Sequence, residues 1–113
     1  MLSEDRDIAY IWDILDSAKS ILDFIKNKSY TDYLNDKLLR SAVERHLEII
    51  GEAASKISKS FRDDNPDIPW AKIIAQRNVL IHEYGEIQHE LIWKVVTFHL
   101  PDLISKLEKY FPD

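Results

Sequence analysis

Four side chains that could do chemistry lie within eight residues of one another. Arg77, Asn78, His82 and Tyr84 supply a fixed cation, an amide, an imidazole and a phenol. On a helix of 3.6 residues per turn, Asn78 and His82 stand one turn apart, and Arg77 and Tyr84 stand two turns apart on an adjacent side. The four could therefore flank one groove. Because an arginine fork fits a phosphate and histidine exchanges protons near neutral pH, this spacing favours anion binding and proton transfer.

The surrounding residues predict that these side chains lie at the end of an apolar helix. Val79 and Ile81 can turn toward a core, and Gly85 can adopt the left-handed conformation that closes a helix. His82 then falls in the last turn, where the negative end of the helix dipole favours the protonated imidazole. A helix that stops at Gly85 would hold the polar group at an exposed end.

Each polar residue also has a purely structural interpretation. Arg77 could form a surface ion pair, and His82 could cap the helix. Asn78 could be a spacer, and Tyr84 could lie half buried at the helix end. Glu52 could pair with Arg77 across the fold as a supporting residue, or it could be an ordinary exposed glutamate.

The residue types and spacings of the chain argue against several other kinds of functional site. The remaining histidines, His46, His89 and His99, have no metal-ligand spacing with one another or with His82. The chain has no cysteine and only two glycines, so thiolate sites and glycine-rich phosphate loops are excluded. The sequence therefore predicts no metal site and no cofactor.

Composition predicts a single all-α domain over residues 1–113. Hydrophobic residues make up 45% and charged residues 31%, the balance of a soluble globular protein. Two glycines and four prolines favour long helices over sheets with many turns. With no signal-like N-terminus, no stretch long enough to span a membrane and no cysteine, the expectation is a cytoplasmic protein that does not enter a membrane.

Apolar residues that recur every three or four positions predict four main helices with short connections, as in an up-and-down bundle. On the first helix the predicted apolar stripe consists of Ile8, Ile11, Trp12, Leu15, Ala18, Leu22 and Ile25. A short helical turn near Thr31 or Asp32 should precede the second main helix, and Pro101 should kink or divide the last one. The expected helices run from Ser3 to about residues 27–29, from residues 35–36 to about Phe61, from Pro69 to Gly85, and from about Gln88 onward.

The second predicted helix carries an apolar stripe wide enough to cover two neighbours. This width places it at the centre of the fold or against a partner chain. Gly51 lies in its middle, where glycine costs about 1 kcal/mol relative to alanine. Close approach of another helix backbone would compensate for this cost; the alternative is a tolerated defect.

The net charge of -5 argues against a protein that coats nucleic acid nonspecifically. Two groups of basic residues at helical spacing could still line a local groove, or could be solvated helix faces. These groups are Lys56, Lys59 and Arg62, and Lys37, Arg40 and Arg45.

Several motifs together resemble the HepT family of HEPN-domain toxins. The pattern Arg-x4-His-x-Tyr at 77–84 follows Leu-Glu-Ile-Ile-Gly-Glu-Ala-Ala at 47–54 and Ile-Pro-Trp at 68–70. The resemblance extends from Arg-Asp-Ile-Ala-Tyr at 6–10 to Leu-Pro at 100–101, so it covers nearly the whole chain. It implies a HEPN-like bundle and the toxin of a type VII toxin–antitoxin system of the HepT/MntA type.

The resemblance also implies how such a protein works. HEPN toxins are homodimeric, metal-independent endoribonucleases with tRNA among their targets, and their arginine and histidine meet at the dimer interface. Arg77, Asn78 and His82 would be the catalytic residues. A minimal, MntA-like nucleotidyltransferase antitoxin would transfer AMP from ATP to Tyr84. The alternatives are a non-catalytic nucleotide-binding or scaffolding subunit of a nucleotidyltransferase complex and a helical adaptor.

Overall fold

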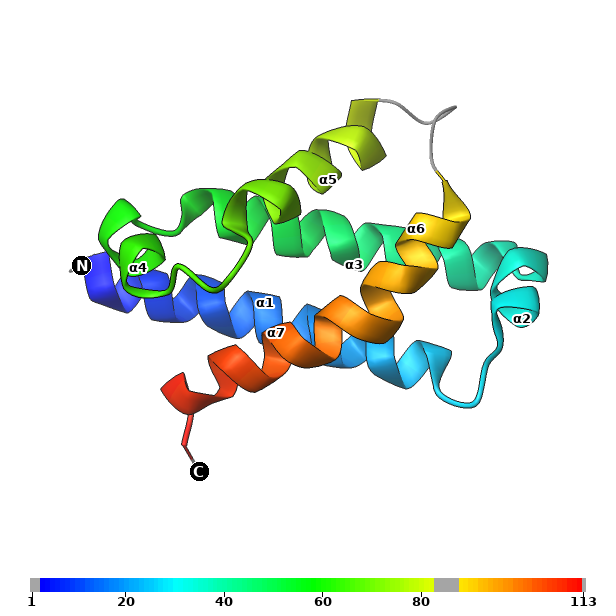
Figure 1. Ribbon diagram of the computed structural model, residues 1–113, viewed down its shortest axis with the longest axis horizontal. Coiled ribbons are helices and arrows are strands. Elements are labelled where there is room, and N and C mark those ends of the chain that lie inside the picture. Colours follow the sequence, from blue (N-terminus) through cyan, green and yellow to red (C-terminus); the bar gives the residue numbers. More distant parts are fainter. Residues whose placement is uncertain (1–2, 83–87, 113) are drawn as a thin grey trace.

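Two long antiparallel helices, α1 (Ser3–Ile25) and α3 (Lys37–Lys56), form one layer of the fold (Figure 1). The computed structural model describes residues 3–82 and 88–112, with side chains for all of these except residues 3–5, 81 and 82. Within these ranges the chain is an all-α bundle, as predicted from the apolar periodicity. The other elements are α2 (Tyr30–Asn35), α4 (Lys59–Asp64), α5 (Trp70–His82), α6 (His89–Lys94), the π-helix η2 (Val95–His99), α7 (Leu100–Leu107) and the 3-10 helix η3 (Glu108–Tyr110).

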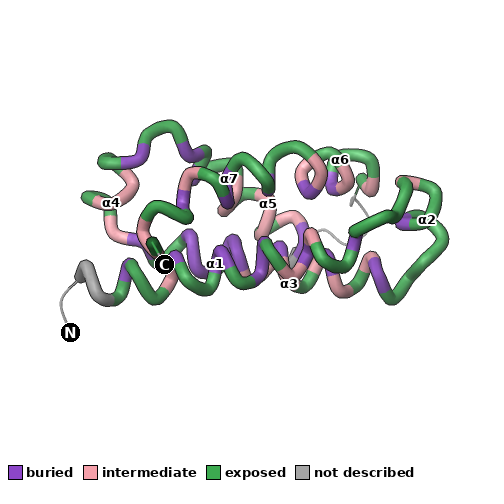
Figure 2. The backbone as a smooth tube through the Cα atoms, turned by 90° about the horizontal axis from the view of Figure 1, so that it is seen from below, coloured by how far each residue is buried: buried purple, intermediate pink, exposed green. Residues whose placement is uncertain are grey.

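The core lies between the α1–α3 layer and a second layer formed by α5 and the continuous α6–η2–α7 segment. Figure 2 shows the buried positions of α1 and α3 recurring along the helices. The helix α3 packs against both α1 and α5, and α7 packs against α1. The central position predicted for the second helix is therefore confirmed. Each helix in the described part of the chain is too short or too polar to cross a bilayer.

The buried face of α1 differs in part from the predicted one. Ile14 and Ile21 are buried, although the predicted stripe omitted them. Ile8 and Trp12 were placed in the stripe, but both are exposed. Since the helix turns 100° per residue, a face centred on Ile11 and Ala18 carries Trp12 toward its edge.

The short helix predicted near Thr31 and Asp32 is present as α2, and its start has a clear local cause. The Ser29 hydroxyl accepts a hydrogen bond from the backbone N–H of Asp32 at 3.1 Å. The Asp32 carboxylate accepts one from the backbone N–H of Ser29 at 2.8 Å. This reciprocal capping box lowers the pKa of the Asp32 carboxyl. The preceding helix ends at Ile25, slightly before the predicted end, and Asn27 has the left-handed φ of 62° that turns the chain.

The second main helix does not run to Phe61, so that prediction was wrong. The α3 helix ends at Lys56, and α4 begins at Lys59 with Ser58 as its N-cap. The Ser58 hydroxyl accepts from the backbone N–H of Phe61 at 3.2 Å. The buried carboxylate of Asp7 accepts from the Ser58 backbone N–H at 2.9 Å and from its hydroxyl at 2.6 Å. A side chain of α1 thus stabilises a helix start that local periodicity does not reveal.

Replacing Asp7 with alanine is expected to lower the free energy of unfolding by about 1.5 kcal/mol, because two hydrogen bonds to a buried carboxylate are lost. Urea denaturation followed by circular dichroism measures the change. Asp16→Ala is the matched control on the same helix, since Asp16 is exposed. Equal stabilities of the two variants would show that the contact between Asp7 and Ser58 contributes nothing.

The predicted interruption at Pro101 takes the form of a π-helical segment directly before it. Proline has no N–H to donate, and its ring crowds the carbonyl four residues earlier. The η2 segment lies where this crowding occurs, and Pro101 occupies the first turn of α7. The Thr97 hydroxyl donates to the Trp93 carbonyl at 2.7 Å within the same region. The last predicted helix therefore continues as α6–η2–α7, with altered helical geometry in its middle.

Candidate functional site

Arg77 lies on α5 where this helix crosses closest to α3. A methyl group placed on Gly51 would overlap the Arg77 Cβ and would come within 3.2 Å of both the Arg77 Cγ and the Ile73 carbonyl oxygen. Gly51 is buried, and there is no free space beside it on the side that faces α5. Any larger residue there would push α5 outward. The predicted close approach of another helix at Gly51 is confirmed, and the residue above it is Arg77.

The Arg77 guanidinium is half-buried and only partly hydrogen-bonded. Its Nη1 donates to the Asn78 side-chain oxygen at 3.4 Å. Its Nε is buried and has no hydrogen-bond partner among the described residues. A buried donor without a partner is costly, and an anionic oxygen would satisfy it well. Arg77 therefore carries a fixed positive charge and an Nε donor without a described hydrogen-bond partner. The first carbons of its side chain are held in place by the crossing of α5 and α3.

The structure locates the other predicted residues to different degrees. Asn78 is exposed beside Arg77 and accepts from it. His82 is the last described residue of α5, about one and a half turns beyond Arg77. The His82 side chain and all of Tyr84 and Gly85 lie outside the described residues, so the predicted groove and the stop at Gly85 stay predictions.

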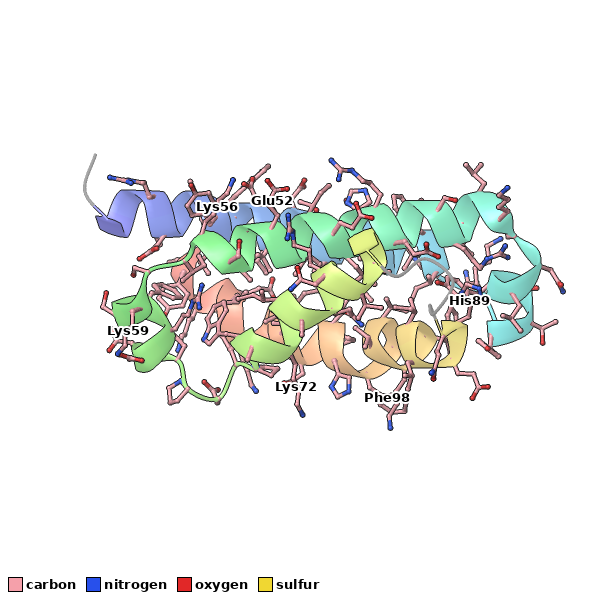
Figure 3. The ribbon with its side chains drawn as sticks, turned by 90° about the horizontal axis from the view of Figure 1, so that it is seen from above. Glu52, Lys56, Lys59, Lys72, His89 and Phe98 are labelled. Carbon is pink, nitrogen blue, oxygen red and sulfur yellow. The ribbon has the colours of Figure 1, made fainter. Side chains whose placement is uncertain are left out.

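Glu52 does not pair with Arg77. Its carboxylate forms an ion pair with Lys56 at 3.4 Å, and both side chains are about half exposed. Figure 3 shows Glu52 and Lys56 side by side along α3. Gly51, one position earlier, is the residue that faces α5, and a rotation of 100° carries Glu52 away from it. Of the two interpretations weighed for Glu52, the structure supports the exposed glutamate.

The first predicted basic group does not form a free cationic groove. Lys56 pairs with Glu52, Lys59 pairs with Asp63 at 2.8 Å, and Arg62 donates to the carbonyls of α3 near its end. In the second group, Arg45 pairs with Glu48 at 3.2 Å, and Arg40 donates to the carbonyl of Leu34. Salt bridges and backbone contacts therefore account for most of these side chains.

A second polar cluster, not predicted from the sequence, lies where α2, α3 and α6 meet. The Tyr33 ring is fully buried, and its hydroxyl has no partner among the described residues. The same holds for the buried Nδ1 of His89, whose ring meets Tyr33 edge to face at 6.2 Å between centroids. Burial raises the pKa of both the Tyr33 phenol and the nearby Glu44 carboxyl, while His89 and Arg40 act in the opposite direction on Glu44.

A cavity of about 60 Å³ opens between α5 and the η2–α7 segment. Its walls are mostly apolar side chains such as Leu47, Ile73 and Leu100, and its polar and charged lining residues are Gln76, His99, Asp102 and Lys106. Among the described side chains, those of residues 6–80 and 88–112, no three His, Asp or Glu residues lie together as metal ligands. The Arg77 crossing, the Tyr33–His89 cluster and this apolar cavity are three candidate features of the described part of the chain.

Comparison with known proteins connects this arrangement to a family. The sequence model described as "Ribonuclease HepT-like" matches residues 14–110. The chain is 41% identical to "Putative RNase MJ1380" of Methanocaldococcus jannaschii, over 91% of this chain and 95% of that protein. It is 38% identical to "Probable ribonuclease HepT" of Thermococcus cleftensis, over 88% of this chain and 91% of that protein. No solved structure matches this chain significantly.

Proposed function

The chain belongs to the HepT-like ribonuclease family, and from this membership we propose that it is the toxin of a type VII toxin–antitoxin system, a metal-independent endoribonuclease acting on tRNA. Membership assigns RNA cleavage in general to the chain. The observation that carries the finer proposal is the Arg77 guanidinium, held above Gly51 with a buried donor that has no described partner.

Cleavage of RNA without a metal needs three groups around the scissile phosphate. A base removes the proton of the 2'-hydroxyl, whose oxygen then attacks phosphorus. An acid gives a proton to the departing 5'-oxygen, and a cation stabilises the negative charge that gathers on the phosphoryl oxygens. Arg77 supplies the cation, and Asn78 orients it through the 3.4 Å hydrogen bond. His82 supplies one proton-transfer group.

One protomer has one His82, so the acid and the base together require two copies of the chain. We assign the second imidazole to the partner's His82 in a homodimer whose twofold axis passes near the end of α5. Pairing the sites also gathers two Arg77 charges in a protein whose net charge is -5. The proposed dimer thus supplies both the missing titratable group and the local attraction for RNA.

Product analysis tests this reaction. Wild-type protein incubated with a total tRNA pool in EDTA should leave 2',3'-cyclic phosphate and 5'-hydroxyl ends, because the 2'-oxygen becomes the nucleophile and no metal participates. End labelling and mass spectrometry identify the products. Activity that is lost in EDTA and restored only by a divalent cation would contradict the metal-independent mechanism. Absence of any cleavage would favour the alternative of a non-catalytic nucleotide-binding or scaffolding subunit.

The partner expected for this chain is a minimal nucleotidyltransferase that uses ATP. Transfer of AMP to Tyr84 would place a phosphate near the Arg77 cation, where it would occupy the cation and repel RNA. Co-expression with the partner should add about 329 Da per AMP, the mass of one adenylate group, and Tyr84→Phe should abolish the addition. AMP on Tyr110, which lies 26 residues after Tyr84, would contradict this assignment.

A further inference from the structure

One surface adjoining the site has no role in the fold. It is formed by Lys72 and Gln76 of α5, Lys94 of α6, and Phe98 and His99 of η2, here named the α5–η2 face. The cavity of about 60 Å³ lies between its two sides, since Gln76 of α5 and His99 of η2 both line it. Figure 3 shows Lys72 and Phe98 extending on the same side of the molecule.

Phe98 is a large aromatic residue of this face whose side chain contributes little to the packing of the core. Its side chain is 71% exposed, although it stands in the helical segment between the buried Val96 and Leu100. It also stands within the π-helix, and π-helical turns occur frequently at functional sites. Pro101 explains why the segment is π-helical, but not why a large aromatic residue occupies the outward position. An exposed flat ring is the feature on which a nucleic-acid base stacks.

The charges around Phe98 fit a polyanion. Lys94 lies one turn before Phe98, and Lys72 lies on α5 one turn before Gln76; neither lysine forms a salt bridge with a described residue. The acidic residues Asp102 and Asp67 both pair with Lys106, at 2.9 and 3.8 Å, so one of their two negative charges is offset. Two cations therefore flank an exposed aromatic ring and a half-buried amide that can both donate and accept hydrogen bonds.

The face is also continuous with Arg77. Ile73 lines the cavity and is one helical turn before Arg77, and Gln76 directly precedes it. Because Lys72 stands about 140° around α5 from Arg77, a polynucleotide whose phosphate lies at Arg77 reaches Lys72 by passing around the helix beside Gln76.

We propose that the α5–η2 face binds the single-stranded RNA that flanks the scissile phosphate, with one base stacked on Phe98 and phosphates near Lys72 and Lys94. The inference rests on the proposed function, because that function places the scissile phosphate at Arg77. The isolated ring between cations favours RNA over a protein partner, which would need a continuous apolar patch.

Binding of a non-cleavable probe tests the proposal separately from catalysis. The probe is a fluorescein-labelled ten-nucleotide single-stranded DNA, which lacks the 2'-hydroxyl, and fluorescence anisotropy gives its Kd. Phe98→Ala should weaken binding about tenfold, whereas Phe98→Tyr should stay within about twofold, since the stacking surface is kept. Lys72→Ala and Lys94→Ala should each reduce the slope of log K against log salt by about 0.7.

Leu91→Ala is the matched control, because Leu91 is a large apolar residue that is 54% exposed on the same helical segment, seven residues before Phe98. It should bind the probe as the wild type does. Wild-type affinity of Phe98→Ala would overturn the proposal. A changed elution volume of Phe98→Ala in size-exclusion chromatography with unchanged affinity would also overturn it, and would identify a protein interface instead. Loss of probe binding in Phe98→Ala upholds the inference even if the wild type cuts no RNA, an outcome that would remove the proposed function alone.

Discussion

Replacing Arg77 with alanine is expected to lower RNA cleavage by about a thousandfold. The guanidinium is the fixed cation of the proposed site, and removal of one such transition-state donor typically costs two to five orders of magnitude. Single-turnover cleavage of a tRNA substrate measures the rate. Arg77→Lys should recover only part of it, because an ammonium keeps the charge but lacks the forked donors.

The loss should not come from unfolding. Alanine keeps the Cβ that packs above Gly51, and it removes the buried Nε that has no described partner, so stability should change by less than about 1 kcal/mol. Arg45→Ala is the matched control, since Arg45 is an exposed arginine whose described ion pair is with Glu48. Wild-type cleavage by Arg77→Ala would remove Arg77 from the mechanism, as wild-type cleavage by His82→Ala would remove His82.

Replacing Gly51 with alanine is expected to reduce cleavage about a hundredfold without altering any polar group. The added methyl would overlap the Arg77 Cβ, so α5 and its guanidinium must move. A displacement of the order of 1 Å in a positioning element can cost about a hundredfold in rate. Stability should fall by about 1 kcal/mol, because the overlap outweighs the better helix propensity of alanine.

A second substitution separates this overlap from other effects of Gly51→Ala. In an Arg77→Ala background the Cβ remains, so Gly51→Ala should still destabilise the protein. In an Arg77→Gly background the overlapping atom is gone, and Gly51→Ala should become stabilising by up to about 1 kcal/mol through helix propensity. Urea denaturation of the four proteins measures both differences. The same sign in both backgrounds would show that Arg77 is not what Gly51 accommodates.

Local sequence signals predicted the elements that depend on neighbouring residues. The short helix expected near Thr31 or Asp32 is α2, whose start the structure shows to be fixed by the capping box of Ser29 and Asp32, and Pro101 marks the altered geometry before α7. Both effects act within four residues, so they can be read from the chain. The break between α3 and α4 could not be predicted in this way, since Asp7 binds Ser58 from 51 positions away. Folding brings the Asp7 carboxylate to Ser58, where it stabilises the start of α4. The apolar periodicity continues through this position and therefore gave no sign of a break.

For the site, the sequence by itself determined the residue types and their spacing: Arg77, Asn78 and His82 follow one another along one helix, because helical periodicity fixes their relative directions. Only the tertiary structure decided which residues each of these side chains contacts. The crossing of α5 over α3 places Arg77 on Gly51 and directs Glu52 to Lys56, and the meeting of α5 with η2 creates the cavity beside Phe98. These contacts depend on how helices that are distant in the sequence pack against one another. A shift of α5 by one helical turn relative to α3 or η2 would replace each contact with a different one.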